Sequence, residues 1–146
     1  MSSIKPPSQV ELTQLKSIAE RLSMAWSTMS VSEMLSEIVS DNRFVRNPAV
    51  VSSFGADSAV LLHMISQIQP EAQVVFLDTG FHFKETIRYR NHLISTFGLK
   101  NVRTASVDPL AIKRRDPTRR LHLSQPDQCC QLRKMSVLDR HLRMND

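Results

Sequence analysis

Two adjacent cysteines, Cys129 and Cys130, are the only cysteines of this 146-residue sequence. Consecutive Cα atoms lie about 3.8 Å apart, whereas a disulfide usually joins Cα atoms about 4.4 to 6.8 Å apart. The pair is therefore expected to be two reduced thiols or two metal ligands, and not a disulfide.

The residues around this pair predict a helix that begins just before it, at Pro126-Asp127. In the first turn of a helix the dipole favours a thiolate. Arg133 and Lys134 follow the first and the second cysteine by four residues, so each cation is predicted to share a helical face with a thiol and could hold a sulfate. The alternative is a small buried pair of thiols packed in an apolar cluster. The apolar residues of that cluster would be Leu132, Met135 and Leu138.

A second constellation, Ser53-Phe54-Gly55-Ala56-Asp57-Ser58, lies between a predicted strand and a predicted helix. A turn of small residues there leaves backbone N–H groups free at the positive end of the helix dipole, and two serine hydroxyls add donors. This pattern favours an anion cradle. The alternative is an ordinary turn in which Asp57 or Ser58 caps the helix. The Gly-Lys-Ser/Thr ending of a Walker loop is missing.

A third constellation is Leu77-Asp78-Thr79-Gly80, followed by Phe81-His82-Phe83-Lys84-Glu85-Thr86. A turn at the end of a strand can offer main-chain groups to the edge of a base, and the aromatic rings can pack against it. A helix N-cap at Thr79 would explain the same residues equally well.

The elements that must position these turns follow from apolar periodicity. Short β-rich runs predict strands at 49–53 and 74–77 and a third at 102–105, and residues at helical spacing lie between them, the second helix ending at Gly98. Alternating strands and helices with short connections predict an α/β domain with a parallel sheet and flanking helices. Ligands of such sheets bind beyond the carboxyl ends of the strands, where Gly55 and Gly80, two of the three glycines, are found.

The N-terminal part reads differently, with helical spacing from Leu15 to Leu22 and a second short helix from Ser32 to Val39. We therefore expect a helical segment at 1–45 and the α/β domain at 46–146.

Composition narrows the class of protein. The formal net charge of +5 favours an anionic ligand. The densest basic group lies in a stretch with few aromatic residues and little periodicity, which we interpret as a solvated loop and not as a nucleic-acid surface. That group is Lys113, Arg114, Arg115, Arg119 and Arg120. No apolar stretch approaches the roughly 20 residues of a membrane span, and no signal or transit peptide is recognisable at the start, so a cytoplasmic location is expected.

Taken together and in this order, the three constellations indicate one protein family more specifically than any of them does alone. Ser-Phe-Gly-Ala-Asp-Ser, Leu-Asp-Thr-Gly with His-Phe-x-Glu-Thr, and Cys-Cys-x-x-Arg-Lys resemble the adenylyl-sulfate and phosphoadenylyl-sulfate reductase family, from about Val50 to Leu142. The resemblance implies the adenine-nucleotide alpha-hydrolase, or PP-loop, fold. It implies that the segment 53–58 and the turn 77–79 hold the nucleotide, and that Lys134, helped by Arg133, faces the sulfate.

The cysteine pair resembles the iron–sulfur branch of this family, which reduces adenylyl sulfate to sulfite and AMP with thioredoxin in assimilatory sulfate reduction. The resemblance implies that Cys129 and Cys130 are half of a [4Fe–4S] ligand set, since such a cluster takes four thiolates. The sequence reaches Asp146 before the family's Cys-x-x-Cys, its nucleophilic cysteine and its substrate-binding arginines. We therefore expect a C-terminally truncated chain that binds substrate without turnover, and self-association through an incomplete sheet edge.

Three alternatives stay open. The first is a phosphoadenylyl-sulfate reductase. The second is a non-reductase PP-loop module such as an adenylating ATP pyrophosphatase, whose loop usually has a second Gly and a Lys where this sequence has Phe54 and Ala56. The third is a non-catalytic interaction protein, which would bind neither AMP nor adenylyl sulfate.

Overall fold

The computed structural model describes residues 8–40 and 47–143, and the chain divides into two units, 1–35 and 36–146. The first unit contains helix α1 (Gln9–Trp26), and helix α2 (Val31–Ser40) runs across the division. Both N-terminal helices are confirmed. The predicted domain boundary at 45/46 falls outside the described residues and stays a prediction.

Both helices begin with a reciprocal serine–glutamate pair. Ser8 Oγ accepts the backbone N–H of Glu11 at 3.3 Å, and the Glu11 carboxylate accepts the Ser8 N–H at 2.7 Å. Ser30 and Glu33 repeat the same arrangement at the start of α2. Each pair satisfies two N–H groups that a helix start otherwise leaves without a partner.

The second unit is built on a parallel sheet of three strands, β1 (Ala49–Val51), β2 (Gln73–Asp78) and β3 (Val102–Ser106), in the order β1-β2-β3. Val75 of β2 pairs with Val51 on one side and with Arg103 on the other. All three predicted strands are confirmed within two residues at each end. The central strand β2 holds the consecutive buried residues Val74, Val75 and Phe76, as expected for a strand covered on both faces.

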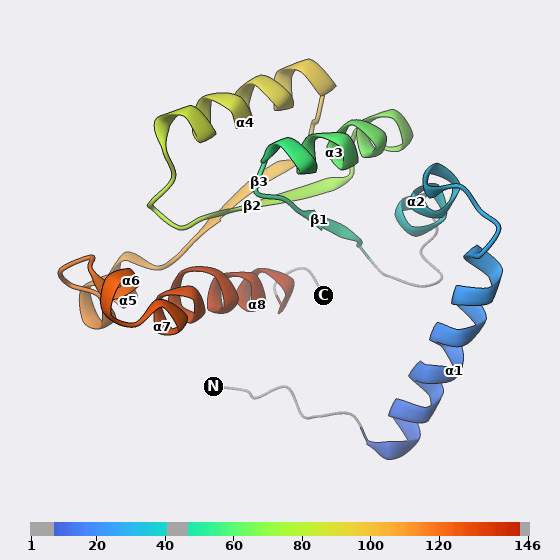
Figure 1. The fold of residues 1–146 in the computed structure, drawn as a ribbon, viewed down its shortest axis with the longest axis horizontal. Coiled ribbons are helices and arrows are strands. Elements are labelled where there is room, and N and C mark those ends of the chain that lie inside the picture. The colour runs from blue at the N-terminus through green and yellow to red at the C-terminus, as the bar shows by residue number, and fades with distance from the viewer. Residues whose placement is uncertain (1–7, 41–46, 144–146) are drawn as a thin grey trace. The chain divides into compact units, whose positions relative to one another are not determined.

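Helices cover the two faces of this sheet (Figure 1). The crossovers α3 (Ala56–Ile68) and α4 (Lys84–Phe97) lie together on one face. On the other face, the π-helical segment η1 (Gln131–Met135) contacts β2, and α8 (Ser136–Arg143) contacts β3. The predicted α/β class is therefore confirmed as a helix–sheet–helix arrangement. Gly98 ends α4 in the left-handed conformation with φ of 64°, as its position predicts.

Along the sequence between β3 and α8, the chain forms α5 (Pro109–Arg115), α6 (Leu121–Ser124) and α7 (Pro126–Cys130). The interpretation of 113–115 as loop is wrong, because these residues form the last turn of α5. The missed signal is Asp108-Pro109: the Asp108 carboxylate accepts the Leu110 N–H at 3.0 Å, and proline is well suited to the first helical position. The three basic side chains of this turn are exposed.

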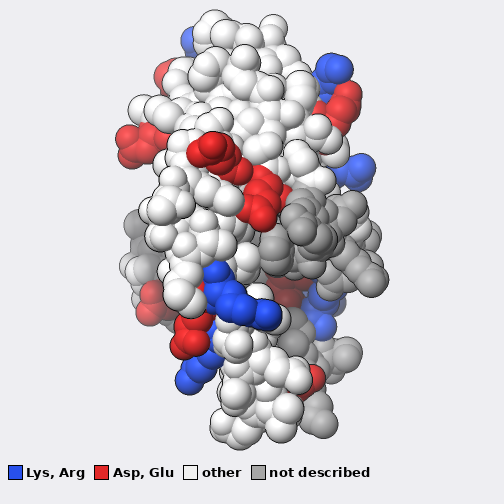
Figure 2. Space-filling model, turned by 90° about the vertical axis from the view of Figure 1, so that its right-hand side faces the viewer, with Lys and Arg blue, Asp and Glu red and all other residues white. Residues whose placement is uncertain are grey.

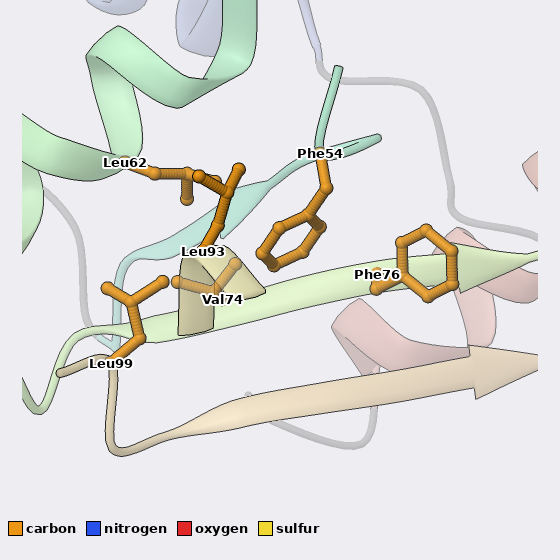
Figure 3. Packing of buried hydrophobic residues seen from close by; sticks show 6 residues of the cluster. All are labelled: Phe54, Leu62, Val74, Phe76, Leu93 and Leu99. Atoms are coloured by element: carbon orange, nitrogen blue, oxygen red, sulfur yellow. The ribbon is translucent and has the colours of Figure 1, made fainter. Parts of the chain in front are cut away.

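Two apolar clusters fill the space on either side of the sheet. The cluster under α3 and α4 is drawn in Figure 3 and has Val74 and Phe76 of β2 at its base. Its buried members are Phe54, Leu62, Val74, Phe76, Leu93 and Leu99. The opposite cluster gathers Val107, Leu132 and Val137 against Leu77 and Ala105. The alternation of β2 side chains thus supplies both clusters.

In the part of the chain that the structure describes, no helix has both the length and the apolar character needed to cross a bilayer.

The first cluster gives a test of the fold. Leu62 is completely buried, whereas its neighbour Leu61 is 39% exposed. Leu62→Ala is expected to lower the free energy of unfolding by about 3 kcal/mol, because it leaves a cavity beneath α3. Leu61→Ala is the matched control and should cost less than about 1 kcal/mol. Urea denaturation followed by circular dichroism measures both, and equal losses would contradict this packing.

Candidate functional site

The segment after β1 leaves its backbone exposed while one side chain anchors it. The Ser52 N–H donates to the Val75 carbonyl at 3.0 Å, and Ser52 Oγ accepts the Phe54 N–H at 3.0 Å. Phe54 has a φ of 56° and its ring is buried, edge-on to Phe76 with centroids 5.8 Å apart (Figure 3). Because the phenyl ring points into the core, the residues on either side, Ser53 and Gly55, face solvent.

Helix α3 then begins at Ala56 without a side-chain cap. Gly55 is the N-cap residue and offers no side-chain oxygen. The alternative in which Asp57 or Ser58 caps the helix is wrong, since both lie inside it. The first N–H groups of a helix have no acceptor within the helix, so the start of α3 presents donors and the positive end of its dipole at the carboxyl edge of the sheet.

The turn after β2 is held by its own side chains. Asp78 Oδ1 accepts the Gly80 N–H at 2.8 Å, and Thr79 Oγ1 accepts the Phe81 N–H at 3.3 Å. Gly80 has a φ of 75°, a conformation that side chains disfavour. The interpretation of Thr79 as a helix N-cap is wrong, because α4 starts only after Phe83. We call residues 78–81 the β2 turn.

Arg133 is committed to this turn and to a buried carboxylate. Its Nη1 donates to the Thr79 carbonyl at 2.8 Å, and its Nη2 donates to Asp116 Oδ2 at 2.6 Å. The guanidinium carbon lies 4.4 Å from the centre of the Phe81 ring. Arg133 Nε has no hydrogen-bond partner within the described residues. Both terminal guanidinium nitrogens of Arg133 are thus bonded within the protein, and its predicted role beside Lys134 at the sulfate stays a prediction.

The carboxylate partner ties a second segment to the same point. Asp116 Oδ1 accepts the Leu121 N–H at 3.0 Å, while Oδ2 accepts from Arg133. Burial alone would raise the pKa of Asp116, but the hydrogen bond from Arg133, the N–H of Leu121 and the charge of Arg133 together hold that pKa below its ordinary value of 3.8. Asp116 is therefore ionised in the folded protein at neutral pH.

A pocket of about 190 Å³ joins the β2 turn to the cysteine pair. Cys129 is buried within it, whereas Cys130 and Lys134 are exposed. Its lining residues are Thr79, Phe81, His122, Pro126, Cys129, Cys130, Arg133 and Lys134. The structure thus brings together both thiols, both cations after them and two residues of the β2 turn, Thr79 and Phe81. The segment 53–58 does not line this pocket and follows the neighbouring strand β1.

The helix that bears the thiols begins at Pro126, as predicted, but it is not α-helical throughout. After α7 the segment η1 adopts π-helical geometry, in which the Ser136 N–H bonds to the Gln131 carbonyl. A π turn holds one residue more than an α turn. The predicted proximity of each cation to a thiol is compatible with this geometry, since all four side chains line one pocket.

The sequence pattern did not predict three of the residues that build this site. Asp116 is the buried partner of Arg133, Arg119 Nη2 donates to the Gly80 carbonyl at 3.0 Å, and the His122 ring lies 4.8 Å from that of Phe81. Arg119 and His122 contact the β2 turn from about 40 residues further along the chain, and Asp116 reaches it only through Arg133, so no local sequence spacing predicts these contacts. The basic composition of 113–120 was the one available signal.

No group of three or more histidine, cysteine, aspartate or glutamate side chains suited to a metal ion occurs among residues 8–40 and 47–143. The cysteine pair offers two of the four thiolates that a [4Fe–4S] cluster takes. It fits such a cluster as half of a ligand set and does not fit it alone.

On the face drawn in Figure 2, basic and acidic side chains lie in small interspersed groups. That face therefore has no broad field of one sign among the described residues, of the kind that binds polyanions.

The Asp116–Arg133 pair predicts a dependence of stability on pH. Asp116→Asn leaves a buried guanidinium without its counter-charge and should lower the free energy of unfolding by about 3 to 5 kcal/mol at neutral pH. The pKa of Asp116 is lower in the folded than in the unfolded chain, so the stabilisation is present above the ordinary pKa and is lost as the pH falls through the folded value. The gap between wild type and Asp116→Asn should therefore narrow below about pH 4.

Urea titrations across this range measure the gap. Asp139→Asn is the matched control, because Asp139 forms an exposed ion pair with Arg143 at 3.0 Å and should cost less than about 1 kcal/mol throughout. A gap that stayed constant down to about pH 3 would contradict the assignment.

Known proteins share this fold and these segments. A crystal structure of phosphoadenylyl-sulfate reductase from Candida auris, in a phosphate complex, aligns with 98% of this chain and 66% of its own, with a TM-score of 0.71 and 21% identity. The predicted PP-loop-type fold is thereby supported.

Curated relatives are closer in sequence. An adenosine 5'-phosphosulfate reductase of Mesorhizobium japonicum is 53% identical over 92 residues, covering 63% of this chain and 36% of the relative. That of Mycobacteroides abscessus is 33% identical over 132 residues, 90% of this chain and 54% of the relative. A phosphoadenosine 5'-phosphosulfate reductase of Gloeobacter violaceus is 32% identical over 84% of this chain and 51% of its own length. The chain thus spans about a third to a half of these relatives. The phosphoadenosine phosphosulfate reductase domain model matches residues 47–146, and the chain belongs to that family.

Proposed function

We propose that this chain is the substrate-binding part of an adenylyl-sulfate reductase, an enzyme that reduces adenylyl sulfate to sulfite and AMP with thioredoxin. The observation that carries the proposal is the pocket shared by the β2 turn, the cysteine pair and Lys134. Relatives named adenosine 5'-phosphosulfate reductase support the same substrate. Because the chain spans only part of their length, the activity of the whole enzyme is inferred from the family.

In this proposal the nucleotide lies along the carboxyl edge of the sheet. The exposed amides at the start of α3, with the hydroxyls of Ser53 and Ser58, receive the phosphate. The turn formed by Leu77, Asp78 and Thr79 faces the adenine and ribose. Lys134 is an exposed cation of the pocket and is proposed to face the sulfate, whereas Arg133 acts from beneath by holding the turn.

The two thiols are proposed to be ligands of a [4Fe–4S] cluster, with the remaining ligands supplied from outside these 146 residues. Both are free cysteines at the same pocket, one buried and one exposed. When bound, the cluster would place a compact charged group beside Lys134. Cys129 and Cys130 then hold the cluster and are not available as the nucleophile.

The reaction proposed for the family takes its two electrons from thioredoxin. A cysteine thiolate attacks the sulfur of adenylyl sulfate, the bond from sulfur to the phosphate oxygen breaks, and AMP leaves with the electron pair. One thioredoxin thiol then attacks the cysteine sulfur of the enzyme-bound thiosulfonate and sulfite leaves; the second thiol resolves the mixed disulfide, which returns the enzyme cysteine and leaves thioredoxin as its disulfide. With both thiols assigned as ligands, we expect these 146 residues to bind the nucleotide without turning it over.

Two alternatives concern the substrate. A 3'-phosphorylated substrate is favoured by the relative from Gloeobacter violaceus. A non-reductase PP-loop module would bind the nucleotide with no requirement for the cysteine pair. Calorimetry with adenylyl sulfate, phosphoadenylyl sulfate and AMP separates these, and a sample that binds none of the three is an interaction protein.

The proposal includes a cytoplasmic location, where thiols stay reduced, and self-association through the edge of β3. Among the described residues β3 pairs only with β2. Arg140 Nη2 already donates to the Ser106 carbonyl at this edge, at 2.6 Å, which limits pairing to the earlier residues of the strand. Neither nucleic acid nor a membrane is a proposed partner.

The predicted anion cradle at the start of α3 can be tested by removing one of its backbone N–H donors. Ala56 is the first residue of α3, a position that tolerates proline and needs no N–H for the helix. Ala56→Pro should weaken AMP binding by about tenfold or more, because a hydrogen bond to a charged group contributes about 1.5 to 3 kcal/mol. The melting temperature should stay nearly unchanged. Val31→Pro, at the same position of α2, is the control, and calorimetric affinities equal to wild type in both variants would exclude the cradle.

The place of the sulfate can be tested with two ligands. Lys134→Ala should weaken adenylyl sulfate binding by about fivefold, since a charge-assisted hydrogen bond is lost, while AMP, which lacks the sulfate, should bind almost as well as before. Lys113→Ala removes an exposed cation of α5 and should change neither affinity. Equal losses for both ligands in Lys134→Ala would place this lysine at the phosphate instead.

A further inference from the structure

A single buried pair of charges connects the β2 turn to the segment that carries the thiols. Arg133 lies three residues after Cys130, and its guanidinium bonds to the Thr79 carbonyl at 2.8 Å. Its ion pair with Asp116 measures 2.6 Å, with 1% and 2% of the two side chains exposed. A displacement of the Thr79 carbonyl therefore acts directly on the residues beside the cysteines.

The contact is fixed from several directions at once. Asp116 is held by the Leu121 N–H, which fixes the orientation of its carboxylate toward Arg133. The Phe81 ring lies 4.4 Å from the Arg133 guanidinium, 5.6 Å from that of Arg119 and 4.8 Å from the His122 ring. Cations over an aromatic face and buried hydrogen bonds have narrow geometric optima. The β2 turn and the segment 116–133 are thus packed as one body.

We propose that Asp116 and Arg133 are positioning residues that couple nucleotide binding at the β2 turn to the packing of Cys129. This inference rests on the proposed function of the turn as a nucleotide site. A nucleotide that orders the turn strengthens the hold of Thr79 on Arg133, and Arg133 and Cys129 line the same pocket. Because coupling free energies are reciprocal, packing at Cys129 in turn favours the binding-competent turn.

Arginine geometry makes the coupling specific. One planar guanidinium reaches Thr79, Asp116 and the Phe81 ring together. A lysine at this position keeps the charge but offers a single ammonium, which cannot make a fork of two hydrogen bonds over a ring. Arg133→Lys therefore separates charge from geometry, and Asp116→Asn removes the charge while keeping the shape.

The test measures alkylation of the 146-residue chain by iodoacetamide in the presence of a chelator, read separately at each cysteine by peptide fragmentation mass spectrometry. Cys129 is 8% exposed, so its reaction reports opening of the segment, and direct shielding by AMP in the shared pocket would persist in variants that still bind AMP. Saturating AMP is expected to slow alkylation of Cys129 by about threefold or more in wild type, a shift of the size that allosteric couplings commonly show. The effect should be lost in Asp116→Asn and Arg133→Lys.

Asp139→Asn is the control, since it breaks an exposed ion pair of the same chemistry on α8, and it should keep the wild-type response. A merely structural ion pair would change the basal rate in the variants but not the response to AMP. The inference is overturned if AMP binds wild type without slowing Cys129, or if the response persists undiminished in both variants.

Two further experimental results also have a defined interpretation. If wild type binds no AMP, the proposed function fails and the coupling fails with it, whereas AMP binding without slower alkylation of Cys129 overturns the coupling alone. If both variants fail to fold, the presence or absence of the AMP response in wild type and Asp139→Asn decides.

Discussion

The two charges of Asp116 and Arg133 are both withdrawn from water, and three segments meet at them: the β2 turn through Thr79, the start of α6 through Leu121, and η1 through Arg133 itself. Desolvating two charges is costly, and good geometry with extra hydrogen bonds is needed to offset that cost. Here both carboxylate oxygens and both terminal guanidinium nitrogens are bonded, which offsets part of that cost, while Arg133 Nε has no partner among the described residues. The position of the cysteines relative to the sheet follows from this pair.

A second constraint lies one strand away. Phe54 adopts a positive φ that is uncommon for a residue with a side chain, and it is held there because its ring fills the core beneath α3 against Phe76. The consequence is an exposed backbone on either side and a helix that starts without a side-chain cap. Packing of the Phe54 ring into the core thereby leaves the backbone N–H donors at the start of α3 available. A site for an anionic nucleotide requires such donors.

The cysteine pair joins these two features to redox chemistry. Its thiols share a pocket with the β2 turn but supply only two thiolates, which is why we treat the pair as part of a larger ligand set. The helix that carries them continues into a π-helical turn, which contains Arg133 and Lys134. One of these cations is buried against Asp116, and the other stays exposed at the pocket. Arg133 and Lys134 therefore have different roles, the first within the fold and the second at the surface of the pocket.

The sequence by itself determined the α/β class, the three parallel strands, both N-terminal helices and the two turns beyond β1 and β2, because apolar periodicity and turn residues are local properties. It also identified the family, since three motifs in a fixed order are specific where each alone is weak. It did not reveal the role of Arg133, the missed contributors Asp116, Arg119 and His122, or the π turn. The contacts of Arg133 join residues about 17 to 54 positions apart, and only the folded chain, by removing Asp116 and Arg133 from water together, decides which charges pair and which remain available to a ligand.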